Sequence, residues 1–535
     1  MIKLWFWVMA QGPLVVHVKN LVFLLCLLLS ACMVGPDYKE PAKPEARHWK
    51  TNPTSVNERP FKNPEWWTSF HDPTLTQLIQ KGYSSNLSLQ SAGVKVLQAR
   101  AQLAQSVGQL YPQQQAIVGN YTYYRVGGGS LQNLLPTNID TAMLGFSANW
   151  ELDFWGKYRR AILSNDGMFL ASVAAYDNAL ITLTSDIANT YIKIRMVEAQ
   201  IKVTKANIEV QKIGLYLANV RYQAGQTSLI DVEQAKTELT ETESKLPTLV
   251  GQLQVQKDVL SVLLGEVPNQ LDGYLNARPH RGIPLAPVSV AVGIPKETLA
   301  RRPDIATARL QAIAQSEMIG STKANLFPSL SLAGTFAFSS NNIGSSSTSD
   351  LFQWSNRTIT AGPGLNWPFL NYGQITNAVR VQDAVFQQAL LNYVNVVLKA
   401  QQEVQDNITL FIEANVAKQY LVKSNQAAIK TLKLALVRYR EGEIDFTPVL
   451  YAEQQQLRVQ SSLINAEGDI PQALVALYRS LGGGWEIRRG HDVVPEEMKQ
   501  AMAKRTNWGV LLQPQEHQMP TTSQQWFRQL YLPRW

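Results

Sequence analysis

Cysteine is nearly absent from this chain of 535 residues, which contains only Cys26 and Cys32, both near its start. These two cysteines provide no disulfide framework, and no zinc-type spacing of cysteine and histidine occurs. The six histidines are scattered, and there is no G-x-S-x-G, Walker or H-E-x-x-H pattern. These absences argue against an enzyme and against a bound metal or other cofactor.

A concentrated basic patch and a long apolar run are also missing. The formal net charge is +8, but the basic residues are spread along the whole chain, so we expect no nucleic-acid partner. After the N-terminal region, no stretch reaches the roughly 18 consecutive apolar residues that suggest a transmembrane helix. We therefore expect no helical membrane span in the body of the chain.

The N-terminus has the pattern of an export signal. A short apolar run, Leu21 to Leu29, follows Lys19 and is too brief to span a bilayer comfortably. The order Leu29-Ser30-Ala31-Cys32 resembles a bacterial lipoprotein box, which implies that residues 1–31 are a signal peptide and that Cys32 carries acyl chains such as palmitate. Met33, which is not an aspartate, favours sorting to the outer membrane. A plain signal peptide with an incidental cysteine is the alternative, and the true start codon stays open.

The chain contains one phrase twice, "VRYQAG" at Val220–Gly225 and "VRYREG" at Val437–Gly442, at an offset of 217 residues. The same offset aligns many other positions without a gap. Examples are Asn149-Trp150 with Asn366-Trp367, Gly156 with Gly373, and Leu264-Gly265 with Leu481-Gly482. This pattern indicates an internal duplication of one large unit, with repeat 1 at 76–266 and repeat 2 at 296–485.

We predict a helix followed by a β-hairpin in each repeat. The hairpin is expected at about 112–152 in repeat 1 and at about 328–369 in repeat 2. In "SLSLAGTFAFS" apolar and polar residues alternate, as they do in a strand with one apolar face. The loops are rich in Gly, Ser and Asn, which is typical of exposed turns. Trp150, Trp354 and Trp367 lie near the expected strand ends and would suit an aromatic girdle.

A very long helix follows each hairpin, because no proline occurs from Thr137 to Leu246 or from Phe369 to Thr447. Apolar residues recur every seventh position, which predicts a coiled-coil stripe. The stripe of repeat 1 is Leu180, Ile187, Ile194, Ile201, Ile208, Leu215 and Tyr222; that of repeat 2 is Val397, Val404, Phe411, Leu432 and Tyr439, interrupted by Lys418 and Asn425. We expect each long helix to end at Gly225 or Gly442, after which a second helix returns.

Two repeats supply four strands, which cannot close into a membrane barrel, and open strand edges cannot face lipid. If the strands enter a membrane, several chains must combine. Three chains would supply twelve strands and twelve helices.

Several stretches resemble the TolC family of outer membrane factors, in particular its lipoprotein branch, which is OprM/NodT-like. They are "ACMVGPDYKEP", "ARRPDIATARLQAIAQSEMIGSTKANLFPSLSLAGTFAF", "LNWPFLNYGQI" and "LYRSLGGGWE". The resemblance implies an α+β membrane protein that forms a homotrimer, in which a 12-stranded β-barrel in outer membrane lipid continues into a 12-helix coiled-coil α-barrel. It also implies a periplasmic adaptor and an inner-membrane pump, usually of the resistance-nodulation-division (RND) type.

By this resemblance the two helical tips form a closed periplasmic mouth. Asp231 and Tyr439 match positions that tie neighbouring hairpins together. The other tip candidates are Arg221, Tyr222, Arg438, Glu441, Glu443, Asp445, Gly225 and Gly442. Relatives carry an aspartate of an acidic pore ring where this chain has Tyr451, with Pro448 three residues before it, so that ring is in doubt. Glu441, Glu443 and Asp445 could replace it or could be solvated tip charges.

The resemblance assigns the remaining segments mainly to a belt at the waist of the tunnel. The lipidated N-terminal segment 32–75 and the proline-rich linker 267–295 are expected there, and 486–535 is expected to be a partly disordered periplasmic tail.

The predicted function is the outer membrane exit duct of a tripartite efflux system, which passively exports drugs or other small molecules. Alternatives are a type I secretion duct and a structural coiled-coil envelope lipoprotein. The scattered methionines make a copper or silver duct the less favoured cargo class. The sequence names neither the cargo nor the particular pump and adaptor.

Overall fold

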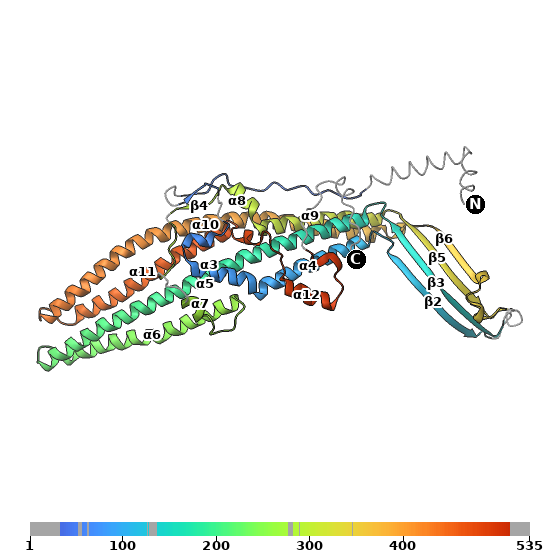
Figure 1. The fold of residues 1–535 in the computed structure, drawn as a ribbon. Coiled ribbons are helices and arrows are strands. Elements are labelled where there is room, and N and C mark those ends of the chain that lie inside the picture. Colours follow the sequence, from blue (N-terminus) through green and yellow to red (C-terminus); the bar gives the residue numbers. More distant parts are fainter. Residues whose placement is uncertain are drawn as a thin grey trace.

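The computed structural model describes residues 33–51, 56–60, 64–125, 127, 136–276, 282–287, 289–344 and 346–513. The molecule is elongated, with a β-sheet at one end and the tips of two helical hairpins at the other (Figure 1). Among the residues described, no helix combines the length and hydropathy that crossing a bilayer requires. The predicted signal peptide and Cys32 lie outside the described residues.

Four strands form one antiparallel sheet in the order β2-β3-β5-β6. They are β2 (Gln114–Arg125), β3 (Asn138–Leu152), β5 (Ser329–Asn341) and β6 (Arg357–Asn366). Each repeat contributes one hairpin, and β3 joins β5 across the repeats, with Phe146 opposite Phe336. In this chain β2 and β6 each pair on one side only.

The register places apolar side chains from all four strands on one face. Ile117 pairs with Phe146, Phe146 with Phe336, and Phe336 with Ile359. The exposed members of this face are Ile117, Tyr121, Tyr123, Leu144, Phe146, Leu332, Phe336, Ile359 and Leu365. Ser147, Thr335 and Thr360 share the opposite face. The predicted alternation is therefore present, and the apolar face has no cover in a single chain.

The helices repeat as the strands do. The two long helices are α5 (Lys157–Gln223) and α10 (Tyr372–Arg440), and the returning helices are α6 (Leu229–Leu263) and α11 (Thr447–Ser480). The shorter helices are α3 (Pro73–Ser85), α4 (Leu87–Gly108), α7 (Asp272–Asn276), α8 (Pro295–Arg301) and α9 (Pro303–Lys323). Because α5 has 67 residues and α10 has 69, each is about 100 Å long at about 1.5 Å per residue.

The predicted stripes are buried along most of their length. Leu180, Ile187 and Ile194 are fully buried in α5, as are Val404 and Phe411 in α10. The two stripes end differently, because Tyr439 is fully buried whereas Tyr222 is 43% exposed.

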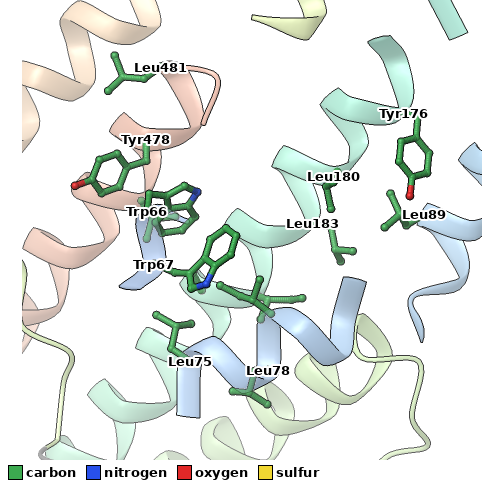
Figure 2. Packing of buried hydrophobic residues seen from close by; sticks show 14 of the residues in the cluster. Trp66, Trp67, Leu75, Leu78, Leu89, Tyr176, Leu180, Leu183, Tyr478 and Leu481 are labelled. Atoms are coloured by element: carbon green, nitrogen blue, oxygen red, sulfur yellow. The ribbon is translucent and has the colours of Figure 1, made fainter. Parts of the chain in front are cut away.

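The main hydrophobic core lies at the waist, where the short helices cover α5 and α11 (Figure 2). Trp66 and Trp67 lie in the 3-10 helix η1 (Trp66–Phe70) and are almost fully buried. The Trp66 ring stacks on Tyr478 of α11 at 5.4 Å between ring centroids. Asp72 begins α3 by accepting hydrogen bonds from the backbone N–H groups of Thr74 and Leu75.

Residues 33–51, here called the N-terminal strap, run along α10. Gln401 accepts a hydrogen bond from Ala46 N–H and donates one to the Pro44 carbonyl. Gln405 pairs in the same way with both backbone groups of Lys50. Beyond the strap, β1 (Val56–Asn57) pairs in parallel with β4 (Val290–Ala291) of the linker.

The segment after repeat 2, which we expect to be a partly disordered tail, is packed in its described part. Up to Gln513 it contains η6 (Trp485–Arg488), α12 (Glu496–Arg505) and η7 (Gly509–Leu512), packed on the waist. Arg488 Nε lies 2.5 Å from Asp177 Oδ1 of α5, and Arg100 of α4 donates to the carbonyls of Leu511 and Gln513. Residues 514–535 lie outside the described part of the chain.

The remaining 3-10 helices are η2 (Ala324–Leu326), η3 (Thr348–Asp350), η4 (Trp354–Asn356) and η5 (Phe369–Asn371).

Candidate functional site

Three tryptophans fix the base of the sheet to the helices. The indole N–H of Trp150 donates to the Leu110 carbonyl at 3.1 Å, and that of Trp367 donates to the Leu326 carbonyl at 3.1 Å. These two bonds are equivalent in the two repeats. Trp155 donates to the Pro328 carbonyl at 2.8 Å. Aromatic rings with one satisfied polar atom therefore gather where the strands meet the helices, which is the arrangement of an interfacial girdle.

The first described residues after Cys32 are held at this same level. Val34 N–H donates to the Trp155 carbonyl at 3.1 Å. Gly35 has φ +111°, and a Cβ there would lie 2.4 Å from Gly320 Cα, so only glycine fits this close approach. The N-terminal strap therefore begins at the base of the strands.

Arg160 of α5 fastens the start of the strap. Its guanidinium is 2.7 Å from Glu317 Oε2 of α9 and 2.9 Å from Asp37 Oδ1. It also donates to the carbonyls of Gly35 and Pro36. Arg160 is buried, and burial raises the pKa of Glu317 although the arginine partly opposes that shift.

At the opposite end of the molecule, the two tips share one type of helix ending. Gly225 and Gly442 have φ values of +72° and +80°, the left-handed conformation that glycine adopts without strain. Gly225 N–H donates to the Tyr222 carbonyl, and the next residue, Gln226, donates to the Arg221 carbonyl. Gly442 and Glu443 repeat this pattern, which is the Schellman motif.

A set of contacts, here called the latch, joins the two hairpins just above the tips. Arg221 of α5 donates to the Tyr439 carbonyl of α10, and its guanidinium carbon lies 4.5 Å from the centroid of the Tyr439 ring. The Tyr439 hydroxyl donates to Asp231 Oδ2 of α6 at 3.4 Å, and Thr227 donates to the same oxygen. Burial, followed by the nearby Asp231 carboxylate, raises the pKa of Tyr439. The latch therefore consists of Arg221, Thr227, Asp231 and Tyr439.

Tip residues at matching positions of the two repeats have different contacts in the structure. Tyr222 and Arg438 take no part in the contacts of the latch. Tyr222 is exposed, and Arg438 pairs with Glu443 at 2.8 Å within its own hairpin. Position 448, which corresponds to Asp231 at the 217-residue offset, is Pro448. The second repeat therefore lacks the acid on which the latch depends.

The acids considered for a pore ring are all exposed. Glu441 pairs with Arg440, and Glu443 pairs with Arg438. Asp445 has no ion pair among the described residues. Tyr451, at the position of the missing aspartate, is 68% exposed.

Four residues of the tip region did not emerge from the sequence. Thr227 completes the latch, and the Phe446 ring lies edge-on to Tyr439 at 5.3 Å between centroids. Glu238 and Glu453 are buried between the hairpins. Glu453 carried a usable signal, because this acid lies on the same helical stripe as Val449 and Leu457.

No group of three or more His, Cys, Asp or Glu side chains in the described structure is arranged to hold a metal ion.

Comparisons with known proteins agree with this architecture. The model of the family described as "Outer membrane efflux protein" matches residues 78–266 and 294–483. The chain is 27% identical over 477 residues to the cation efflux system protein CusC of Escherichia coli O6:H1, strain CFT073, covering 88% of this chain and 99% of that one. It is 26% identical to nodulation protein T of Rhizobium leguminosarum bv. trifolii, covering 86% and 96%. The structure of the outer-membrane channel OprN superposes with a TM-score of 0.77 at 28% identity, covering 85% of this chain and 100% of that chain.

Proposed function

Because the chain belongs to the outer membrane efflux protein family, we propose that three copies form one continuous exit duct for small molecules, with a mouth closed by the latch. Members of this family are outer membrane efflux channels of tripartite systems, and the chain is such a channel rather than an enzyme. Outer membrane factors of this kind trimerise and work with an adaptor and an inner-membrane pump. An RND-type pump and drug-like cargo are the finer parts of the proposal.

The uncovered apolar face of the sheet is the observation that supports this function most strongly. Nine large, mainly apolar side chains on it are exposed, from Ile117 on β2 to Leu365 on β6. Lipid would cover this face, but β2 and β6 would leave unpaired backbone groups in the bilayer. Pairing β2 of one copy with β6 of the next satisfies these groups, and three four-stranded sheets then give twelve strands. A periplasmic spacer would need neither this face nor these edges.

We place the lipid anchor on Cys32. The chain from Val34 to Asp37 is held at the aromatic base of the strands by Trp155 and Arg160. Acyl chains two residues before Val34 would therefore enter the membrane at the level where the strands begin. Several acyl chains give a stable anchor, whereas a single chain is marginal.

The two repeats, 76–266 and 296–485, would then each supply one hairpin of the barrel and one hairpin of the tunnel. The segments 32–75 and 267–295 would form the belt at the waist, to which 486–513 adds a further layer.

In the trimer, Tyr222 and Arg438 would face the neighbouring chain. The seam between chains would then have Pro448 where the seam within a chain has Asp231. We propose that the latch holds the closed state within each chain. Asp445 is the best-placed acid for the mouth because Glu441 and Glu443 are already paired.

The test of the latch is the conductance of the purified channel in a planar bilayer. The variant Asp231→Ala combined with Tyr439→Phe removes the carboxylate and the hydroxyl that join α6 to α10. We expect a higher conductance than for the parent channel. Tyr222→Phe removes the equivalent exposed hydroxyl and serves as the matched control. A double variant that stays as closed as the parent would count against the latch.

The cargo is addressed by the susceptibility of a deletion strain to a panel of toxic compounds. Increased susceptibility to organic drugs would support the proposed cargo, and unchanged susceptibility to every compound would contradict it.

A further inference from the structure

Two acidic side chains are buried between the hairpins, two helical turns above the latch. Glu453 of α11 is 2% exposed and Glu238 of α6 is 4% exposed. Glu238 accepts hydrogen bonds from Gln454 at 2.8 Å and from Gln211 at 3.4 Å. Glu453 Oε1 is buried without a hydrogen-bond partner among the described residues. Two carboxylates in one buried place are unfavourable when both are ionised.

Neighbouring residues make room for Glu453 but do not neutralise it. A Cβ at Gly214 of α5 would lie only 3.1 Å from Glu453 Oε1, so this glycine provides the space that the carboxyl occupies. Gln211, one turn earlier on α5, has its own Oε1 buried and unpartnered. This oxygen can accept a hydrogen bond from a protonated carboxyl, but it cannot donate one.

The charged groups around Glu453 are few. Among the described residues, Glu238 of α6 is the charged group that acts on it, and no cation does. The α5 helix presents Gln211 and Gly214. A separate apolar cluster between the two hairpins, here called the tip core, includes Leu432 and Ala435 of α10. Burial and the Glu238 carboxylate raise the pKa of Glu453 to about 8.

Solvent has a route to Glu238, the partner of Glu453 in this pair. A groove of about 470 Å³ runs between α6 and α11, and both Glu238 and Gln454 line it. A proton can therefore reach Glu238 from the groove, and Glu238 lies beside Glu453.

We propose that Glu453 and Glu238 form a proton-binding site between the two hairpins and that each chain holds one proton there when the mouth is closed. The proton resides on Glu453, and Glu238 stays a carboxylate held by Gln211 and Gln454. When the hairpins separate, water reaches Glu453 and the proton dissociates. This inference rests on the proposed function, because opening of the mouth is its readout.

The sign of the pH dependence follows from this linkage. The closed state binds one proton more per chain than the open state between the ordinary pKa of a glutamate, about 4.3, and the raised pKa of about 8. The ratio of open to closed channels should rise with pH across this window by up to roughly tenfold per pH unit per chain. Above about pH 8 both states are ionised, so the ratio should level off.

The experiment records single-channel opening of the full-length purified trimer from pH 5 to pH 9. The parent should open more often as pH rises and then reach a plateau. Glu453→Gln keeps the shape of the neutral acid and should open equally rarely at every pH. Glu238→Gln removes the repelling charge, which lowers the closed-state pKa of Glu453, so the plateau should begin at a lower pH. Glu233→Gln, which removes an exposed acid from the same helix, should behave as the parent.

Other results would contradict either the proton site or the latch. A parent channel that ignores pH, when the Asp231 and Tyr439 double variant conducts freely, would refute the proton site and leave the proposed function intact. A double variant that never conducts would refute the proposed latch instead. In that case infrared spectroscopy decides: the carbonyl stretch of a carboxylic acid at pH 7 should be present in the parent and absent in Glu453→Gln, and its absence from the parent would refute the site. A pH response that disappears when a chelator removes divalent cations would assign the site to a metal ion.

Discussion

Replacing Arg160 by methionine should weaken the fold and loosen the N-terminal strap, and the two effects can be separated. The single variant leaves Glu317, which is buried, without its cation. Breaking a buried ion pair in this way costs about 3–5 kcal/mol of stability. Replacing both partners, as in Arg160→Met with Glu317→Leu, removes the uncompensated charge, so the fold should regain most of its stability.

The strap responds differently, because it loses Arg160 in both variants. Asp37 is an exposed partner, with 86% of its side chain accessible, and such a pair contributes at most about 1 kcal/mol. The two bonds to the carbonyls of Gly35 and Pro36 are long, at 3.5 and 3.4 Å. Together these contacts are worth about 1–3 kcal/mol, which corresponds to an increase in strap opening of about 5-fold to 150-fold.

Thermal unfolding reports the first effect, and the rate of trypsin cleavage after Lys39 and Arg47 reports the second, since cleavage of a transiently opened segment follows the population of the open form. Arg380→Met, which removes an exposed arginine, is the control. We expect faster cleavage in both Arg160 variants and a lower unfolding temperature mainly in the single variant. Unchanged cleavage in both would refute the role that we assign to Arg160.

Two further predictions concern the waist. Trp66→Ala should lower the free energy of unfolding by about 3–5 kcal/mol, because Trp66 is fully buried against Tyr478. The measurement is the unfolding midpoint. A loss below about 0.5 kcal/mol, which is typical of a surface substitution, would contradict this packing. A chain truncated after Gly484 should unfold at a lower temperature. The truncation exposes the core beneath Val494 and leaves the buried Asp177 without Arg488. An unchanged unfolding temperature would mean that the packed segment contributes nothing to stability.

The sequence predicted the repeat, the helical tips and the strand alternation because each depends on local patterns. Gly225 and Gly442 adopt the left-handed conformation that ends a helix. This helix ending involves only residues close in sequence. The alternation in β5 follows from the geometry of a strand, so it needed no knowledge of the partner strands.

The sequence could not tell which of two equivalent residues is engaged. Tyr222 and Tyr439 stand in matching phrases, yet only Tyr439 is buried. The difference arises because Tyr439 faces the other hairpin of the same chain, where it contacts Arg221 and Asp231, whereas Tyr222 is exposed. Such a choice depends on tertiary arrangement and not on the phrase itself.

The packed segment after repeat 2 escaped prediction for a related reason. It is short, mixed in charge and without a clear period, and its order comes from distant contacts. Gly93 of α4 illustrates this, since a Cβ there would lie 2.1 Å from the Val493 carbonyl oxygen. Only the folded structure shows that this glycine leaves space for the segment to pack against α4.

The most direct test of the account is native mass spectrometry of the mature protein extracted in mild detergents. We expect a trimer in which each chain begins at Cys32 and carries the added mass of acyl chains. This result would supply the partners that β2 and β6 need. A monomer in several mild detergents would leave the apolar sheet with two open edges and would contradict the duct.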